Sequence, residues 1–132
     1  HMPKRKPKTI PAITLQQPYC WLLMDGRVKT EKRTGATGYR GPVAIVAGKR
    51  NGNMDLHIAR IQRDFPDCPD TGDLTHGSIV GVVDLIDCRV STEPGMRFVW
   101  EFDNPRRLKK PKPYQGLSGT MEVEAKLVRG LV

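Results

Sequence analysis

Hydrophobic residues fall into short runs that alternate with polar ones, as is typical of β-strands. The densest run, residues 77–90 (GSIVGVVDLIDCRV), is rich in β-branched and aliphatic residues and predicts a central strand buried on both faces. Strict alternation places Val80, Val82, Asp84, Ile86 and Cys88 on one face, and Ile79, Gly81, Val83, Leu85 and Asp87 on the other.

Asp84 is the exception on its face, because it lies between Val82 and Ile86. A carboxylate that is buried there without a partner would cost several kcal/mol. We therefore expect Asp84 to meet a cation, a pocket rich in hydrogen-bond donors, or a ligand. The alternative is that the strand bends at this point and Asp84 reaches water.

Weaker patterns predict the other elements. Strands are expected over residues 12–15, 27–34, 42–47, 96–102 and 120–128, and residues 108–114 predict either a loop or an edge strand. Asn104 and Pro105 should end the strand that precedes them. One helix should run from Gln17-Pro18 to Gly26, and another over residues 54–65 with Asn53 as its N-cap. The pattern predicts an α+β fold, a small mixed β-barrel of about six or seven strands with two or three flanking helices.

The length of 132 residues predicts a single domain over residues 12–132. Residues 1–11 are expected to be a tag remnant followed by a basic, flexible arm. No apolar run is long enough for a signal peptide or a membrane span. The three cysteines are far apart, which predicts free thiols, a cytoplasmic protein, and neither a metal site nor a cofactor. We expect a monomer.

The formal net charge of +8 indicates a polyanionic partner. The basic residues gather in three blocks, within residues 4–8, 27–50 and 106–112, whereas acidic residues collect in residues 64–73. Such clustering favours nucleic acid as the partner over a surface that is merely solvated. This hypothesis requires the three basic blocks to meet in space around the open end of the barrel, beside Asp84.

Basic and aromatic side chains supply the contacts that a nucleic acid needs, because cations neutralise phosphates and tyrosines stack on unpaired bases. Gln17 either presents its amide to a base edge or caps the helix that follows. Trp21 and Trp100 are expected in the core, and His57 is expected to be a flanking residue rather than a ligand. The candidate contacts are Gln17, Arg33, Tyr39, Arg40, Lys49, Arg106, Arg107, Lys109, Lys110 and Tyr114.

The order of several segments resembles the ASCH domain family, whose fold is similar to the PUA barrel of RNA-modifying enzymes. These segments are TLQQPYCWLLMDG, GRVKTEKR, YRGPVAI, GSIVGVVDLIDC, FVWEFDNPRRL and PYQGLSGTMEV. The resemblance runs from Ile13 to Val123 and is greatest to the ASCH domain of the activating signal cointegrator proteins. It implies a basic cleft between the first helix, the GRVKTEKR segment and the central strand, which holds nucleic acid or a nucleoside.

The family motif G-x-K-T-x-E-x-R is matched in part. Gly26, Glu31 and Arg33 correspond to its glycine, acid and arginine, and Glu31 thereby joins the candidate nucleic-acid contacts. The lysine position holds Val28, and Lys29 follows one place later. On a strand, a shift of one residue turns a side chain to the other face, so Lys29 reaches the cleft only if a bulge restores the register.

Two functions follow from these residues. The first is a module that binds nucleic acid, RNA in preference to DNA, through the basic cleft. The alternative is a small hydrolase, because some relatives are described as ribonucleases and a bacterial branch as acetylcytidine amidohydrolases. In that case Lys29 and Asp84 would be catalytic, with Thr30 and Ser118 as hydroxyl donors to an oxyanion. A third possibility is an adaptor that binds only protein.

Overall fold

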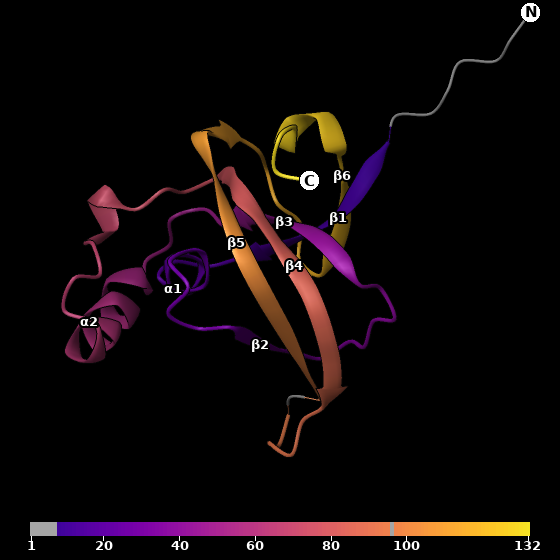
Figure 1. Cartoon of the computed structure of the whole chain (residues 1–132). Coiled ribbons are helices and arrows are strands. Elements are labelled where there is room, and N and C mark those ends of the chain that lie inside the picture. Colours follow the sequence, from indigo (N-terminus) through magenta and orange to yellow (C-terminus); the bar gives the residue numbers. More distant parts are fainter. Residues whose placement is uncertain (1–7, 96) are drawn as a thin grey trace, which may run out of the picture.

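The computed structural model describes residues 8–95 and 97–132, and it has one mixed sheet of six strands (Figure 1). The strands follow the order β2-β5-β4-β3-β1-β6 across the sheet. Strands β1 and β3 are parallel, and the other neighbouring pairs are antiparallel. Their bounds are β1 (Thr9–Leu15), β2 (Thr30–Arg33), β3 (Gly41–Ala47), β4 (Ser78–Val90), β5 (Phe98–Pro113) and β6 (Thr120–Glu124).

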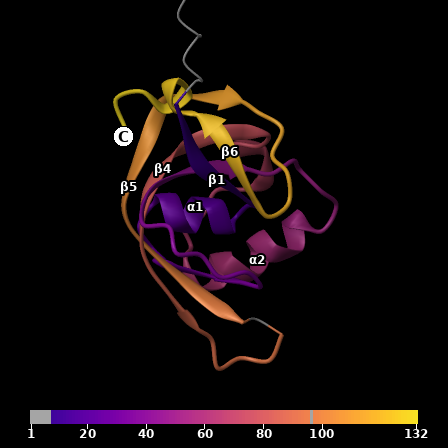
Figure 2. The same ribbon diagram turned by 90° about the vertical axis from the view of Figure 1, so that its right-hand side faces the viewer.

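Two α-helices accompany the sheet, α1 (Tyr19–Met24) and α2 (Met54–Asp64), with the short 3₁₀ helices η1 (Thr71–Asp73) and η2 (Ala125–Val128). The long strands β4 and β5 curve around α1 (Figure 2). Helix α2 lies beyond α1, farther from the sheet (Figure 1). Its Met54 and Ile58 form a small cluster with Leu74, against which Trp21 of α1 packs. Helix α2 is therefore positioned through α1.

The predicted α+β fold with a small mixed sheet and two flanking helices is confirmed, but the sheet is open. Strands β2 and β6 are its edges, and no pairing joins them within the described residues. Strand β2 has four residues and pairs only with the first part of β5, Phe98–Glu101. The predicted closure therefore does not occur in this part of the chain.

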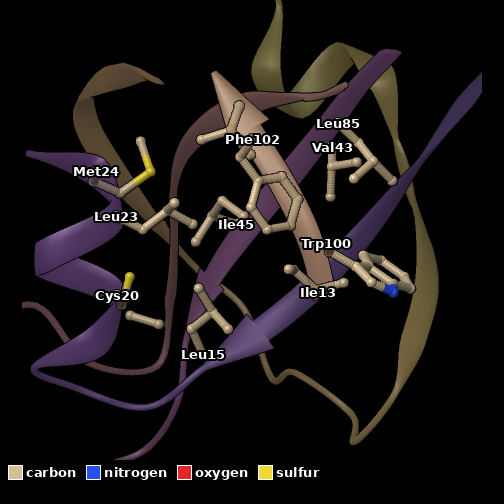
Figure 3. Packing of buried hydrophobic residues seen from close by; sticks show 12 residues of the cluster. Ile13, Leu15, Cys20, Leu23, Met24, Val43, Ile45, Leu85, Trp100 and Phe102 are labelled. Atoms are coloured by element: carbon tan, nitrogen blue, oxygen red, sulfur yellow. The ribbon is translucent and has the colours of Figure 1, made fainter. Parts of the chain in front are cut away.

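The sheet carries a hydrophobic cluster on each face. The cluster on the α1 side brings α1 residues such as Leu23 against Ile45 and Phe102 of the sheet (Figure 3). The cluster on the other face is closed by η2 and the chain that follows it, with Val128 fully buried. Together these clusters make both faces of β3 and of the first half of β4 interior.

Strand β4 departs from strict alternation. Val80 packs against the α1-side cluster together with Val83 and Leu85, whereas Ile79 and Val82 belong to the other cluster. The prediction that Ile79 shares a face with Val83 is wrong for this reason. Against β3 the register shifts at Val80, because Ile45 pairs with Gly81 and Val46 with Ile79, which leaves Val80 as an extra residue of β4. The register with β5 also shifts three times. A bulge inserts one residue, which reverses the faces of the side chains that follow it.

Strand β5 does not end at Asn104 and Pro105, contrary to the prediction. It continues to Pro113 beside β4, with Asn104 at a positive φ of 55°. Beyond Glu101 the opposite edge of β5 is free of β2. A proline lacks only the N–H that would face an open edge, so Pro105 is tolerated there. The edge-strand alternative for residues 108–114 thus holds up to Pro113.

The two ends of the described chain meet. Strand β1 begins at Thr9, so residues 9–11 of the predicted arm belong to the sheet; Lys8 is exposed just before it, and residues 1–7 lie outside the described residues. Met96, the predicted start of a strand, lies outside them as well. The predicted strand over residues 120–128 ends at Glu124, where η2 begins. The backbone N–H of Ala125 donates to the carbonyl of Lys8 at 2.8 Å, which ties η2 to the start of β1.

Candidate functional site

A hollow of about 700 Å³ opens between the start of α1, strand β2, and the chain that enters α2. We call it the polar cleft. Its first two walls come from the segments that the family resemblance implies, but its third wall is the segment from Asn51 to His57 rather than the central strand β4. The lining residues are Thr14, Leu15, Gln16, Gln17, Tyr19, Thr30, Glu31, Lys32, Asn51, Gly52, Asn53, Met54 and His57.

Tyr19 and His57 join two walls of the polar cleft. The Tyr19 hydroxyl lies 3.0 Å from Nδ1 of His57, and the ring centroids are 5.8 Å apart in an edge-on arrangement. His57 is half-buried on α2, beside the buried Ile58, and it lines the cleft. The sequence carried no sign of this pair, because the two residues are 38 positions apart and meet only when α2 packs on α1.

Gln17 is buried and is used within the chain. Its Oε1 accepts a hydrogen bond from the backbone N–H of Trp21 at 2.9 Å, and its Nε2 donates to the carbonyl of Thr75, also at 2.9 Å. It therefore caps the first turn of α1, which was the alternative to contact with a base. Its neighbour Gln16 is exposed and accepts a hydrogen bond from Nδ2 of Asn51 at 3.2 Å.

Glu31 and Arg33 project inward from the short strand β2. The Arg33 guanidinium lies 4.9 Å from the centre of the Trp100 ring, and its Nη1 is 4.0 Å from Oε1 of Glu31. Burial raises the pKa of Glu31, and the charge of Arg33 offsets this only in part. Burial likewise lowers the pKa of Arg33. Each charge is thus held where water solvates it poorly.

Glu31 also acts on the inner side of α1. Burial raises the pKa of the Cys20 thiol to about 12, with Arg107 lowering it and the negative charge of Glu31 raising it further. A thiol with such a pKa is almost entirely protonated at neutral pH, so Cys20 is not a nucleophile there. Cys20, which is outside the lining of the polar cleft, therefore supplies no thiolate.

Asp84 and Lys29, the catalytic residues of the hydrolase alternative, contact different parts of the chain. Oδ1 of Asp84 accepts a hydrogen bond from Nη1 of Arg106 at 3.0 Å, and Oδ2 accepts one from Nδ2 of Asn104 at 3.3 Å. The expectation that Asp84 meets a cation is thereby confirmed. Lys29 is exposed and outside the lining of the polar cleft, although its carbonyl accepts from the N–H of Phe102 at 2.7 Å.

The hydroxyl candidates lie apart from Asp84. Thr30 lines the polar cleft, whereas Ser118 is exposed in the segment before β6. Among the described residues, no hydrogen bond or ion pair joins Lys29 to Asp84. The structure thus groups Thr30 with Glu31, and Asp84 with Arg106.

The candidate phosphate contacts differ in how free they are. Lys49, Lys109 and Lys110 are exposed, and Lys49 lies just before the cleft segment that begins at Asn51. Arg40 donates to the carbonyls of Thr37 and Tyr39 at 3.2 and 2.8 Å. Its Nη2 also lies 3.9 Å from Oδ1 of Asp87, so Arg40 is partly engaged, whereas the three lysines are exposed at the surface.

Arg106 and Arg107 lie on β5 but point to different partners. Besides Asp84, Arg106 binds the carbonyl of Leu131 through Nε at 2.8 Å. Arg107 is half-exposed and donates to Asp25 at 3.2 Å. Because Arg27 binds the same Asp25 at 2.7 Å, the second and third basic blocks meet at this carboxylate.

The two candidate tyrosines pack inward. The Tyr39 hydroxyl donates to the carbonyl of Pro42 at 2.8 Å, and its ring packs against the α1-side cluster. Tyr114 packs against the opposite cluster. Tyr19, which is a further candidate for stacking, lines the polar cleft.

Neither a membrane-spanning helix nor a metal cluster is found in the part of the chain that the structure describes. None of its helices combines the length and the apolar character needed to cross a membrane. Within the same residues, no three His, Cys, Asp or Glu side chains gather closely enough to hold a metal ion. The chemistry of the polar cleft therefore has to be argued from its amides, hydroxyls, rings and charges.

Most of the chain is similar to part of a mouse protein, although no family model matches the chain. It is 27% identical over 135 aligned residues to Activating signal cointegrator 1 of Mus musculus. The alignment covers 89% of this chain but only 23% of the mouse protein. The similarity is therefore to one part of a longer protein.

Proposed function

We propose that the chain is a nucleic-acid-binding module of the ASCH type that holds single-stranded RNA, with one base inserted into the polar cleft. The observation that carries this proposal is the pairing of Tyr19 and His57 over a hollow of about 700 Å³ lined by amides, hydroxyls and Glu31. Rings offer a stacking surface, and amides and hydroxyls offer hydrogen bonds to base edges. The similarity to a part of a signal cointegrator is consistent with this role.

The surface charge supports the same proposal. The net charge of +8 favours a polyanion, and Lys49 and Arg50 are exposed directly before the cleft segment. A strand with one base in the cleft would run its phosphates past these cations, which would release counterions and favour binding. The cleft itself contains the opposite charges of Lys32 and Glu31, whereas Lys49 and Arg50 are outside its lining.

A hydrolase that uses Lys29 and Asp84 is less well supported. Both oxygens of Asp84 accept hydrogen bonds, from Arg106 and from Asn104. A carboxylate that is held in this way stabilises the fold and is poorly placed to take a proton from Lys29. Nucleic-acid binding does not require these two residues to meet.

The proposal is tested by measuring the affinity for a labelled single-stranded RNA by fluorescence anisotropy. Replacement Tyr19→Ala should weaken binding about 5- to 150-fold, the range expected when one base loses its aromatic platform. Replacement His57→Ala should weaken it in the same direction, because Tyr19 then loses its partner at 3.0 Å.

Leu56→Ala is the matched control, because Leu56 is adjacent to His57 on α2 and is 69% exposed. This variant should bind like the unaltered chain. Equal affinity of the Tyr19, His57 and Leu56 variants would refute the role of the polar cleft. Absence of RNA binding by the unaltered chain at low salt would refute the proposed function itself.

A further inference from the structure

The Glu31 carboxylate lies in the polar cleft without a hydrogen-bond donor. Its side chain is 28% exposed, and the nearest cation, Nη1 of Arg33, is 4.0 Å from Oε1, beyond hydrogen-bond distance. Within residues 8–95 and 97–132, no group donates a hydrogen bond to either oxygen of Glu31. Partly buried acceptors without donors are costly, so this carboxylate favours a ligand that brings donors of its own.

An ionised carboxylate accepts hydrogen bonds at two neighbouring oxygens and donates none. It is best matched by two parallel N–H groups, as in bidentate pairs. Among the nucleobases, guanine presents two such donors on one edge, at N1 and N2. Cytosine and adenine place a ring-nitrogen acceptor beside their amino group, and uracil flanks its single N–H with two carbonyls. These acceptors would repel the second carboxylate oxygen.

The other groups of the polar cleft suit the rest of a guanine ring. Tyr19 and His57 provide rings beside which a planar base fits. Thr30 has a hydroxyl, and Gln16 accepts from Asn51 through Oε1, which leaves its amide donors for a carbonyl such as O6. An arginine side chain also has two parallel N–H groups, but the net charge of +8 disfavours a cationic ligand.

We propose that the polar cleft selects guanine, with the two oxygens of Glu31 accepting hydrogen bonds from N1–H and N2–H of the base. This inference rests on the proposed function, because it names the base that the cleft of an RNA-binding module holds. It makes Glu31 a specificity-determining residue, whereas Tyr19 and His57 contribute affinity for any base.

The test compares short oligouridine strands that carry one central guanine, inosine, 1-methylguanine, adenine or cytosine. The unaltered chain should bind the guanine strand about 5- to 150-fold more tightly than the adenine or cytosine strand, the range for a good bidentate base contact. Inosine, which lacks the N2 amino group, should be intermediate, and 1-methylguanine should lose the advantage.

Glu31→Gln should lower the affinity for the guanine strand to that for the adenine strand, because an amide has only one oxygen and cannot accept two parallel hydrogen bonds. Glu124→Gln is the control, since Glu124 ends β6 at the other edge of the sheet and its side chain is 41% exposed. The modified bases test the inference on the unaltered chain, so it remains testable even if Glu31→Gln does not fold.

The outcomes separate the inference from the proposed function. Binding without a base preference, or a preference for adenine or cytosine, overturns the guanine assignment and leaves RNA binding intact. Binding of no strand overturns both. Displacement of the guanine strand by equimolar guanosine monophosphate supports the guanine site and shows that its ligand is a free nucleotide. Tighter binding of an arginine-containing peptide than of the guanine strand overturns the assignment.

Discussion

Glu31 and Arg33 carry opposite charges into the interior from a strand of four residues. Their separation of 4.0 Å does not compensate for desolvation, because burial remains the largest influence on the pKa of each. Such an arrangement lowers the stability of the fold and places a charged group in a cleft. Glu31 is thus more readily explained by ligand binding than by folding.

This cost predicts how stability depends on pH. The pKa of Glu31 is higher in the folded chain than its ordinary value of 4.5, so the folded chain binds the proton more tightly than the unfolded chain does. The resulting stabilisation is fully present below pH 4.5 and is lost as the pH rises through the raised pKa. Glu31→Gln, which is neutral throughout, should therefore gain free energy of unfolding relative to the unaltered chain between pH 4 and pH 7, roughly by the amount of that lost stabilisation.

Urea unfolding of both proteins across this range, followed by circular dichroism, measures the difference. Glu124→Gln is again the control, because Glu124 is paired with Lys126 at the surface. A constant difference between the Glu31→Gln variant and the unaltered chain at all pH values would show that Glu31 is not destabilised by burial.

For single residues, the sequence indicated that Asp84 needs a partner, but it did not identify the residue that pairs with it. Asp84 could be identified as an acid in need of a cation, because its apolar neighbours Val82 and Ile86 are close in sequence. Arg106 could not be identified as that cation, since it pairs with Asp84 only through the register of β4 and β5. His57 was missed for a similar reason, because the packing of Trp21 on α2 brings it to Tyr19.

At the scale of elements, local patterns predicted where strands and helices lie better than how they end. The runs of β3 and β4 and both helices were recognisable because burial of apolar side chains follows a short period. The continuation of β5 through Pro105 was not, because a proline stops a central strand but is tolerated on an open edge, and edges are set by the topology. The irregularities of β4 likewise arise from its pairing with β3 and β5.

Two side chains of β5 bind the C-terminal residues: Lys112 donates to the carbonyl of Leu127 at 2.7 Å, and Arg106 to that of Leu131 at 2.8 Å. Arg106 binds both Asp84 and the carbonyl of Leu131. Arg106→Ala should lower the free energy of unfolding by about 1.5 to 3 kcal/mol, the range for hydrogen bonds to charged groups. It should also increase amide hydrogen exchange after η2 more than in α1, because Leu131 loses its hydrogen bond to β5, whereas Leu127 of η2 keeps the one from Lys112.

The neighbouring Arg107 provides the matched control. Its side chain is 51% exposed and contacts Asp25 at the surface, so Arg107→Ala should cost less than about 1 kcal/mol. In a double-mutant cycle, Arg106→Ala and Asp84→Asn should be less than additive, because each removes the same contact. Additive losses would mean that the pair at 3.0 Å contributes nothing to stability.

At the scale of the whole molecule, acidic residues neutralise some cations and leave others free. Arg27, Arg89 and Arg106 each bind one or two carboxylates. In the described residues, no ion pair involves Lys49 and Arg50 beside the polar cleft, or Lys109 and Lys110 on β5. The free edge of β5 also carries Pro105, Pro111 and Pro113, and charges with prolines protect such an edge from pairing with another chain.

The exposed cations Lys49, Arg50, Lys109 and Lys110 could contact phosphates, and the two lysines of β5 could instead protect its open edge. The salt dependence of RNA binding distinguishes these explanations. If both pairs contact phosphates, the double variants Lys49→Ala/Arg50→Ala and Lys109→Ala/Lys110→Ala should each reduce the slope of log affinity against log salt by about 0.7 per contact removed. Lys126→Ala, whose residue is already paired with Glu124 at 3.1 Å, should leave the slope unchanged. If the β5 lysines serve only to protect the edge, their variant should keep the full slope and aggregate more readily. The slope is informative because it counts the phosphates neutralised at each place, whereas affinity alone would also include the base held in the polar cleft.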